Sequence, residues 1–253
     1  MSGELEGRAA LVTGAGRGIG RAIALELAAS GARLALVSRT RSELEETAAA
    51  IAAAGGGEAA VIEGDLGDPD SIATLARAAA TAIGPVDVLV NNAAVVWPLG
   101  PSVAVDPADW EAAIEVNLFG PVRLTRELLA GMLERRWGRI VNVSSGIVAH
   151  PGAMVGGNAY AAGKAALEAH SVNLAAELDG SGVTVSAFRP GAVDTAMQGW
   201  IRDQDPDEIG AELHQRFVAG HESGDLLTPQ DSAAVLLEHL RAGGTGQIWD
   251  IPA

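Results

Sequence analysis

Apolar segments and amphipathic segments alternate along the whole chain, and this alternation constrains the fold more than any other feature of the sequence. Segments such as AALVTG, RLALVS, VDVLVNNA and GRIVNVSS are dominated by successive Val, Leu, Ile and Ala residues. Strands of this kind are buried on both faces, as in a parallel sheet between two layers of helices. The sequence therefore predicts an α/β fold, a Rossmann-type doubly wound parallel sheet of about seven strands with helices on both faces.

The segments between these strands have the pattern of amphipathic helices. Helices are predicted over residues 19–30, 41–54, 69–83, 107–136, 158–179 and 229–241. No linker-like stretch or shift in composition divides the chain. We therefore expect a single domain over residues 1–253, a length that allows one substantial core.

Composition and charge exclude several classes of function. The chain has no cysteine, so it has neither disulfides nor a cysteine nucleophile. The net charge of -15 argues against nucleic acid or an anionic membrane surface as a partner. No secretory signal and no membrane-length apolar run is visible, and the five histidines lack metal-site spacing. We expect a cytoplasmic protein without a metal site.

A glycine-rich loop, TGAGRGIG, joins the first predicted strand to the first predicted helix. Its glycines, Gly14, Gly18 and Gly20, have the spacing G-x-x-x-G-x-G. Glycines at such a junction let the backbone approach a pyrophosphate, whose charge is stabilised by the helix N-terminus. A tight turn without a ligand is the alternative, but the strand-loop-helix context favours a dinucleotide site.

The end of the second predicted strand indicates which dinucleotide is bound. Cofactors without a 2'-phosphate usually meet an Asp or Glu about 20 residues beyond the loop, on this strand. Here the strand ends with Ser38, Arg39 and Thr40 and offers no carboxylate. Arg39 and Arg17 could hold a 2'-phosphate through charge-assisted hydrogen bonds, although each alone could be a solvated surface arginine. The pattern favours NADP(H).

The only tyrosine of the chain, Tyr160, lies four residues before Lys164 in the segment YAAGK. Residues four apart on a helix lie on the same face, so these two side chains are predicted to be neighbours. An ammonium group beside a phenol favours the phenolate and is expected to lower the pKa of Tyr160. The pair could then act in proton transfer. The alternative is an ordinary tyrosine beside a lysine that reaches into solvent.

Taken together, the motifs of the chain resemble those of the short-chain dehydrogenase/reductase family over nearly the whole length. The resemblance is carried by TGAGRGIG at 13–20, GDL at 64–66, NNAA at 91–94, Asn117, NVSS at 142–145, the Tyr160/Lys164 pair and RPGAVDT at 189–195. The family fold is the one that the strand pattern predicts.

This resemblance implies a catalytic role for four residues. Tyr160 would donate a proton to a carbonyl oxygen, and Lys164 would hold the nicotinamide ribose and lower the pKa of the phenol. Ser145 would bind the substrate carbonyl, and Asn117 would anchor a water in a proton relay. Adjacent strand residues face opposite ways, so Ser144 and Ser145 are expected to point to opposite faces. The family pattern selects Ser145, and Ser144 is the less favoured alternative.

The resemblance also implies the residues that bind NADP(H). They are Gly14, Arg17, Gly18, Ile19, Gly20, Ser38, Arg39, Asp65, Leu66, Asn91, Ala93, Tyr160, Lys164, Pro190, Gly191, Val193 and Thr195. Asp65 is expected at the adenine, Asn91 and Ala93 along the adenosine ribose, and Val193 and Thr195 at the nicotinamide carboxamide.

Family members act on many alcohols and carbonyls, so the substrate is predicted from the C-terminal third. A substrate lid is expected over about residues 195–225, with Met197, Trp200 and Phe217 facing Trp97. The segments DTAMQ, GDLLTPQDSA and GQIWDI resemble the branch of sepiapterin and benzil reductases. The favoured hypothesis is therefore an NADPH-dependent reductase of α-dicarbonyls or aromatic ketones.

Two other functions remain open on sequence alone. The same core would serve a 3-oxoacyl-thioester reductase, and a non-catalytic NADPH-sensing regulator is the alternative from another class. A homodimer or homotetramer through the long helices 107–136 and 158–179 is implied by the resemblance. His150 could line the pocket, but an exposed loop position is favoured.

Overall fold

The apolar segments of the chain form the strands of one sheet in the computed structural model, which describes residues 5–251. In chain order the strands are β1 (Ala9–Thr13), β2 (Arg33–Ser38), β3 (Ala60–Glu63), β4 (Val88–Asn91), β5 (Gly138–Val143), β6 (Val183–Arg189) and β7 (Ile248–Asp250). They lie in the order β3-β2-β1-β4-β5-β6-β7, and every neighbouring pair is parallel. The predicted Rossmann-type doubly wound sheet is confirmed.

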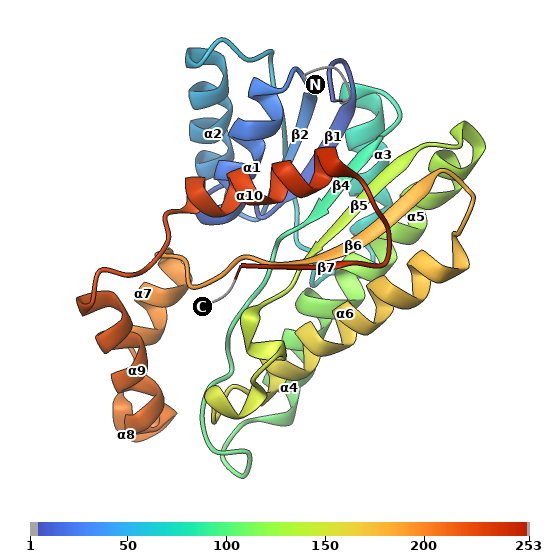
Figure 1. The fold of residues 1–253 in the computed structure, drawn as a ribbon. Helices are drawn as coiled ribbons and strands as arrows, with labels where there is room; N and C mark the ends of the chain where they lie inside the picture. The colour runs from blue at the N-terminus through green and yellow to red at the C-terminus, as the bar shows by residue number, and fades with distance from the viewer. Residues whose placement is uncertain (1–4, 252–253) are drawn as a thin grey trace.

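Helices cover both faces of this sheet (Figure 1). One layer consists of α1 (Gly18–Ala29), α2 (Arg41–Ala53) and α10 (Pro229–Ala242). The other contains α3 (Ile72–Ile83), α4 (Pro107–Ile114), α5 (Gly120–Arg135) and α6 (Asn158–Glu177). The alternating residues of β1 show why both layers are needed. Ala10 and Val12 pack into the cluster under α1 and α10, whereas Ala9 and Leu11 pack into the cluster under α3 and α5.

The predicted helices form with two differences. The helix expected from residue 69 begins only at Ile72, because Ser71 Oγ donates hydrogen bonds to the carbonyl oxygens of Asp65 and Asp68 and holds a turn there. The helix expected over residues 107–136 is interrupted by a π-helical segment, Glu115–Phe119, between α4 and α5. Such π-segments are rare and frequently occur at functional sites.

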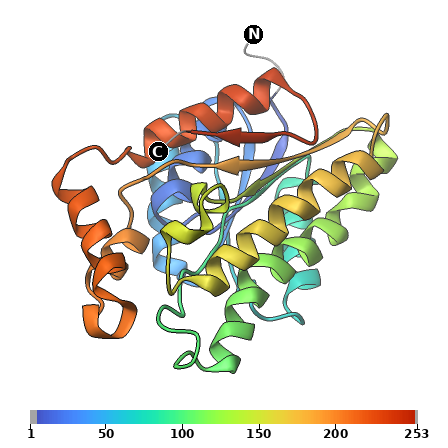
Figure 2. The ribbon, with the colours of Figure 1, turned by 60° about the horizontal axis from the view of Figure 1, so that its bottom comes forward.

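The strand order reverses between β1 and β4, and open sheets of this kind bind ligands at that point, beyond the carboxyl ends of the strands. A cleft of about 430 Å³ lies there. The region after β6 extends beyond the same edge of the sheet as three helices, α7 (Ala196–Arg202), α8 (Pro206–Ile209) and α9 (Ala211–Glu222), which Figure 2 shows to one side of the sheet. Two short 3-10 turns, Gly146–Val148 and Pro151–Ala153, follow β5.

No helix within residues 5–251 is both long and apolar enough to cross a membrane.

Candidate active site

The glycine loop after β1 packs closely against the end of β4. A Cβ atom on Gly20 would lie 2.2 Å from the carbonyl oxygen of Gly14 and 2.4 Å from Nδ2 of Asn92, so the position accepts only glycine without a shift of the backbone. Gly14 and Gly18 have positive φ angles of 63° and 55°. No side chain of the described residues caps the N-terminus of α1, which lines the cleft, so its first N–H groups are available to an anion.

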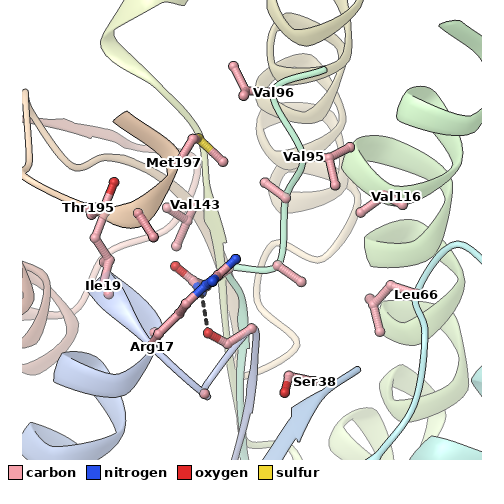
Figure 3. A pocket seen from close by; sticks show the side chains of 18 of the residues that line it. Arg17, Ile19, Ser38, Leu66, Val95, Val96, Val116, Val143, Thr195 and Met197 are labelled. Carbon is pink, nitrogen blue, oxygen red and sulfur yellow. Dashed lines mark hydrogen bonds between the residues drawn. The ribbon is translucent and has the colours of Figure 1, made fainter. Parts of the chain in front are cut away.

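The end of β2 carries the residues expected at a 2'-phosphate. Arg17, Ser38 and Arg39 all line the cleft, and Figure 3 shows Arg17 and Ser38 at the same end of it. Nη1 of Arg17 lies 3.4 Å from Oε1 of Glu43, so this guanidinium already has a carboxylate partner. Arg39 is exposed and makes no ion pair within residues 5–251. Of the two arginines, Arg39 is therefore the cation free to meet a phosphate.

The two adjacent asparagines at the end of β4 face opposite ways. Asn91 is 1% exposed, and its Nδ2 donates to Oδ1 of Asn142 at 2.8 Å and to Oγ1 of Thr125 at 3.2 Å, away from the cleft. Asn92 and Ala93 line the cleft instead, and Nδ2 of Asn92 donates to the carbonyl oxygen of Thr13 at 2.9 Å. The structure thus does not place the side chain of Asn91 beside a cofactor ribose. The alternation of side chains along a strand is the signal that distinguishes Asn92 from Asn91.

Asp65 and Leu66 follow β3 and line the side wall of the cleft, as expected. Oδ1 of Asp65 accepts a hydrogen bond from the backbone N–H of Gly67 at 2.8 Å, which fixes the direction of the carboxylate. Leu66 is 4% exposed, and Figure 3 shows its side chain on the wall that continues to Val116.

Helix α6 and strand β5 bring the predicted catalytic residues together. Tyr160 and Lys164 are both buried on α6, and Nζ of Lys164 lies 5.9 Å from the centre of the Tyr160 ring. Nζ also donates a hydrogen bond of 2.7 Å to the carbonyl oxygen of Val143. Ser145, just beyond β5, lies beside Tyr160 and lowers the pKa of its hydroxyl. The phenol, the ammonium group and one hydroxyl therefore meet at the carboxyl edge of the sheet.

Burial dominates the protonation of this pair. It raises the pKa of Tyr160 above 10.0, and Ser145 only partly opposes the rise. Burial also lowers the pKa of Lys164 to about 8. The sequence predicted that Lys164 lowers the pKa of Tyr160. In the structure this pKa is raised instead, because desolvation disfavours the charged form of both side chains. At neutral pH the phenol is protonated and is a proton donor.

Asn117 lies in the π-helical segment and is completely buried. Its side chain accepts a hydrogen bond of 2.9 Å from the N–H of Val95 and donates one of 2.7 Å to the carbonyl oxygen of Val95. A Cβ atom on Gly163, between Tyr160 and Lys164, would lie 3.2 Å from Cβ of Asn117. Asn117 thus holds the strand extension after β4 against the catalytic helix, with one hydrogen bond accepted and one donated by its side-chain amide.

Ser144 lines the cleft, and its hydroxyl takes part in a buried polar network. Its Oγ donates a 2.7 Å hydrogen bond to Oε1 of Glu168, which is 4% exposed and lies one turn beyond Lys164. Nε and Nη2 of Arg189 each donate to this carboxylate at 2.8 Å, and Nη1 donates to Asp250 at 3.0 Å. The network joins β5, α6, β6 and β7 behind the catalytic residues. Sequence reasoning did not single out Glu168.

Only some residues of the segment after β6 line the cleft. Pro190 and Thr195 line it, and Figure 3 shows Thr195 opposite Val95. Gly191 has a φ of 78°, and Val193 is 3% exposed and bridges in parallel to Leu227. The structure therefore brings Thr195 to the predicted nicotinamide end, while Gly191 and Val193 shape the backbone behind it.

Beyond Tyr160 the cleft becomes apolar. Val96, Trp97, Met197 and Trp200 line this part, which we call the apolar end of the cleft. Tyr160 belongs to the cluster around it, in which the other members are Val96, Met154, Ile201, Ile209 and Leu213, with Leu99, Ile147, Met197 and Phe217 packed against them. All four side chains expected from the lid and its opposing loop thus lie in or against this region. His150 is exposed on its loop, as favoured from the sequence.

No group of three or more His, Asp or Glu side chains in the described part of the chain could hold a metal ion.

Comparison with known proteins agrees with this geometry. The family model for short chain dehydrogenases matches residues 8–206. The nodulation protein G of Rhizobium sp. (strain N33) is 36% identical over 246 residues, which cover 96% of this chain and 95% of that protein. The chain belongs to the short-chain dehydrogenase/reductase family. As a member of this family it is an oxidoreductase.

Two further short-chain dehydrogenase/reductase relatives inform the function. The acetoacetyl-CoA reductase of Allochromatium vinosum is 36% identical over 233 residues, covering 86% of this chain and 93% of that protein. A crystal structure of a variant of actinorhodin polyketide ketoreductase with NADPH has a TM-score of 0.86 at 33% identity and covers 97% of this chain and 95% of that one. Both relatives are named as reductases of carbonyl compounds.

Proposed function

We propose that the protein is an NADPH-dependent reductase that converts a carbonyl group to an alcohol, with Tyr160 as the proton donor. The observation that carries this proposal is the pair of Tyr160 and Lys164 at one end of a cleft whose other end is the glycine loop, with Ser145 beside Tyr160. The glycine loop would hold the nucleotide, and the apolar end of the cleft beside Tyr160 would receive the substrate.

The residues present fit NADP(H). The N–H groups at the start of α1 and the close approach permitted by Gly14 and Gly20 suit a pyrophosphate. Arg39, exposed and without an ion pair in the described chain, suits a 2'-phosphate, and no carboxylate ends β2 to favour a free ribose hydroxyl. The structurally similar ketoreductase was solved with NADPH, which supports the same preference here. Bound NADPH supplies the hydride.

Each protein group has a distinct part in the proton transfer. Hydride addition turns the carbonyl oxygen into an alkoxide, so hydrogen-bond donors at that oxygen stabilise the transition state. Ser145 donates a hydrogen bond to the oxygen, and Tyr160, whose raised pKa keeps it protonated, gives up its proton to it. Lys164 holds the cofactor ribose and, when charged, stabilises the phenolate that remains. Asn117 holds the strand extension at Val95 in place.

The preferred substrates are α-dicarbonyls or aromatic ketones. The apolar end of the cleft presents Val96, Trp97, Met197 and Trp200, which suit an aromatic or alkyl group beside the carbonyl. The resemblance of the C-terminal segments to sepiapterin and benzil reductases supports the same class. Residues 195–225, which form α7 to α9, act as the substrate lid.

A 3-oxoacyl-thioester reductase is the second candidate. It is favoured by the name of the Allochromatium vinosum relative, an acetoacetyl-CoA reductase that is similar over most of both chains. Both candidates need the same catalytic residues, so the distinction between them depends on the lid and the rim of the cleft.

We also propose that the protein assembles as a homodimer or homotetramer through α4–α5 and α6. Phe119 and Leu133 are 43% and 37% exposed on the first of these helices, and Val172 is 41% exposed on the second. These exposed apolar side chains are compatible with such an assembly, and the family resemblance supports it.

A substrate panel tests this proposal. NADPH oxidation is followed with an aromatic 1,2-diketone, sepiapterin, an acetoacetyl thioester and a simple aliphatic ketone, and each assay is repeated with NADH. We expect the diketone to give the highest kcat/KM, and NADPH to exceed NADH. Turnover of the thioester without turnover of any diketone would instead select the second candidate.

A further inference from the structure

The lid carries a strong excess of negative charge. Residues 195–225 contain seven carboxylates and two arginines, and every one of these carboxylates is exposed. The acidic residues are Asp203, Asp205, Asp207, Glu208, Glu212, Glu222 and Asp225. Exposed charges of one sign beside a cleft repel ligands of the same sign and lower their association rates.

The two arginines of the lid offset only part of this charge. The side chain of Arg202 is 19% exposed, and its Nη2 lies 3.7 Å from Oδ1 of Asp194. Arg216 donates a hydrogen bond to the carbonyl oxygen of Ala153, on the opposite wall. Even with both guanidinium charges counted, the seven carboxylates leave the lid with an excess of five negative charges, the histidines being taken as neutral.

The other walls beside the apolar end of the cleft supply no cation. Residues 97–105 and 146–157 contain no Asp, Glu, Lys or Arg, and His150 is their only titratable residue. These walls also touch one another and the lid. The N–H of Gly100 donates to the carbonyl oxygen of Gly156 at 3.0 Å, and a Cβ atom on Gly156 would lie 3.3 Å from the carbonyl oxygens of Gly100 and Ile209. Thr195, Ala196, Met197 and Trp200 are the lid residues that line the cleft, and the lid carboxylates lie on the exposed surface beyond them.

We propose that this lid selects compact, uncharged carbonyl substrates and rejects carbonyls attached to a polyanionic carrier, such as coenzyme A thioesters. This inference rests on the proposed function and decides between its two candidates. The selection is electrostatic, because the lid carboxylates repel the phosphates of the carrier while the reacting ketone itself fits. It would distinguish this chain from its relative that is named as an acetoacetyl-CoA reductase.

The test compares two thioesters with the same ketone but different charge. Acetoacetyl-coenzyme A is polyanionic, whereas the acetoacetyl thioester of N-acetylcysteamine is neutral. With NADPH saturating, to prevent competition at the cofactor site, we expect kcat/KM for the neutral thioester to exceed that for the coenzyme A thioester by about tenfold at low salt. The ratio should fall as the ionic strength rises, because salt screens exposed charges.

A charge-reversal variant of the lid tests whether the lid carboxylates cause the difference in kcat/KM between the two thioesters. The double variant Asp203→Lys/Glu208→Lys replaces two exposed carboxylates, and Asp203 follows the last turn of α7, where a cation is favourable. It should raise kcat/KM for acetoacetyl-coenzyme A about tenfold and leave the neutral thioester unchanged. The control Glu58→Lys/Glu238→Lys makes the same change in net charge at exposed positions outside the lid and should alter neither value.

Each other outcome would overturn either the inference about the lid or the proposed function. A coenzyme A thioester used as well as the neutral one at low salt would overturn the inference, as would an unchanged ratio in the lid variant. Turnover of diketones but of neither thioester would also overturn it, because the neutral thioester would then be rejected without a charge. Failure of every carbonyl with bound NADPH would instead refute the proposed function, and the inference with it.

Discussion

The burial of Lys164 makes the stability of the protein depend on pH in a predictable way. Lys164 is the only lysine of the chain and is 2% exposed. Burial lowers its pKa from 10.5 to about 8 in the folded protein. Between these two values the unfolded chain binds the proton more strongly, so the free energy of unfolding rises with pH. The contribution of this group is complete above pH 10.5 and is lost as the pH falls through 8.

The magnitude follows from the two pKa values. From pH 8 to pH 9.5 the gain amounts to about 1.5 kcal/mol, since each pKa unit corresponds to about 1.4 kcal/mol. Tyr160 does not oppose it in this range, because its pKa is raised in the folded state and its effect is confined to pH values near and above 10. The chain contains no cysteine and no second tyrosine that could titrate here.

Urea unfolding of the cofactor-free protein, followed by tryptophan fluorescence at pH 8.0 and pH 9.5, measures this gain. The matched variant Lys164→Met removes the titrating group and keeps a long side chain. Contributions from other groups cancel in the comparison, so the wild type should gain about 1.5 kcal/mol more than the variant. Equal gains in the two proteins would refute the reasoning, because the ammonium group would then not be desolvated in the folded state.

Three further predictions concern the cofactor loop, the 2'-phosphate end and the buried network. Gly20→Ala should weaken NADPH binding at least about tenfold in a fluorescence titration, because the new Cβ meets the Gly14 carbonyl. The control Gly57→Ala, at a position with open space around it, should leave NADPH binding unchanged. Arg39→Ala should raise the KM for NADPH about tenfold or more and leave NADH unchanged, as expected for loss of a charge-assisted hydrogen bond; an unchanged NADPH/NADH ratio would remove Arg39 from the site. Glu168→Ala should lower the free energy of unfolding by about 3 kcal/mol, because it leaves the Arg189 guanidinium without its main partner. An effect as small as that of the exposed control Glu177→Ala would show that the network contributes little.

The fold could be predicted because it depends on patterns that repeat along the chain. Apolar runs such as those of β1 and β5 are buried on both faces, and their length and spacing leave little choice but a parallel sheet between helices. The glycine loop was also predictable, because Gly20 can hold no side chain where α1 meets β4. Local constraints of this kind are visible without knowledge of distant contacts.

What the sequence could not show depends on contacts between distant segments. The partner of Arg17 is Glu43 on α2, and the partners of Asn91 are Thr125 and Asn142 on α5 and β5. The pKa of Tyr160 was predicted in the wrong direction, because the spacing of two side chains on a helix does not reveal how completely both are desolvated. The π-helical segment could not be predicted from the sequence either, because Asn117 within it contacts Val95, which lies 22 positions earlier in the chain.

The central claim is that Tyr160 delivers the proton during NADPH-dependent carbonyl reduction. The most direct measurement is the rate of NADPH oxidation by wild type and Tyr160→Phe with an aromatic 1,2-diketone, with NADPH binding measured in parallel by fluorescence. The account predicts that the variant binds NADPH but loses at least about 100-fold in kcat, because only the phenolic proton has been removed. A variant that reduces the diketone at the wild-type rate would contradict the claim.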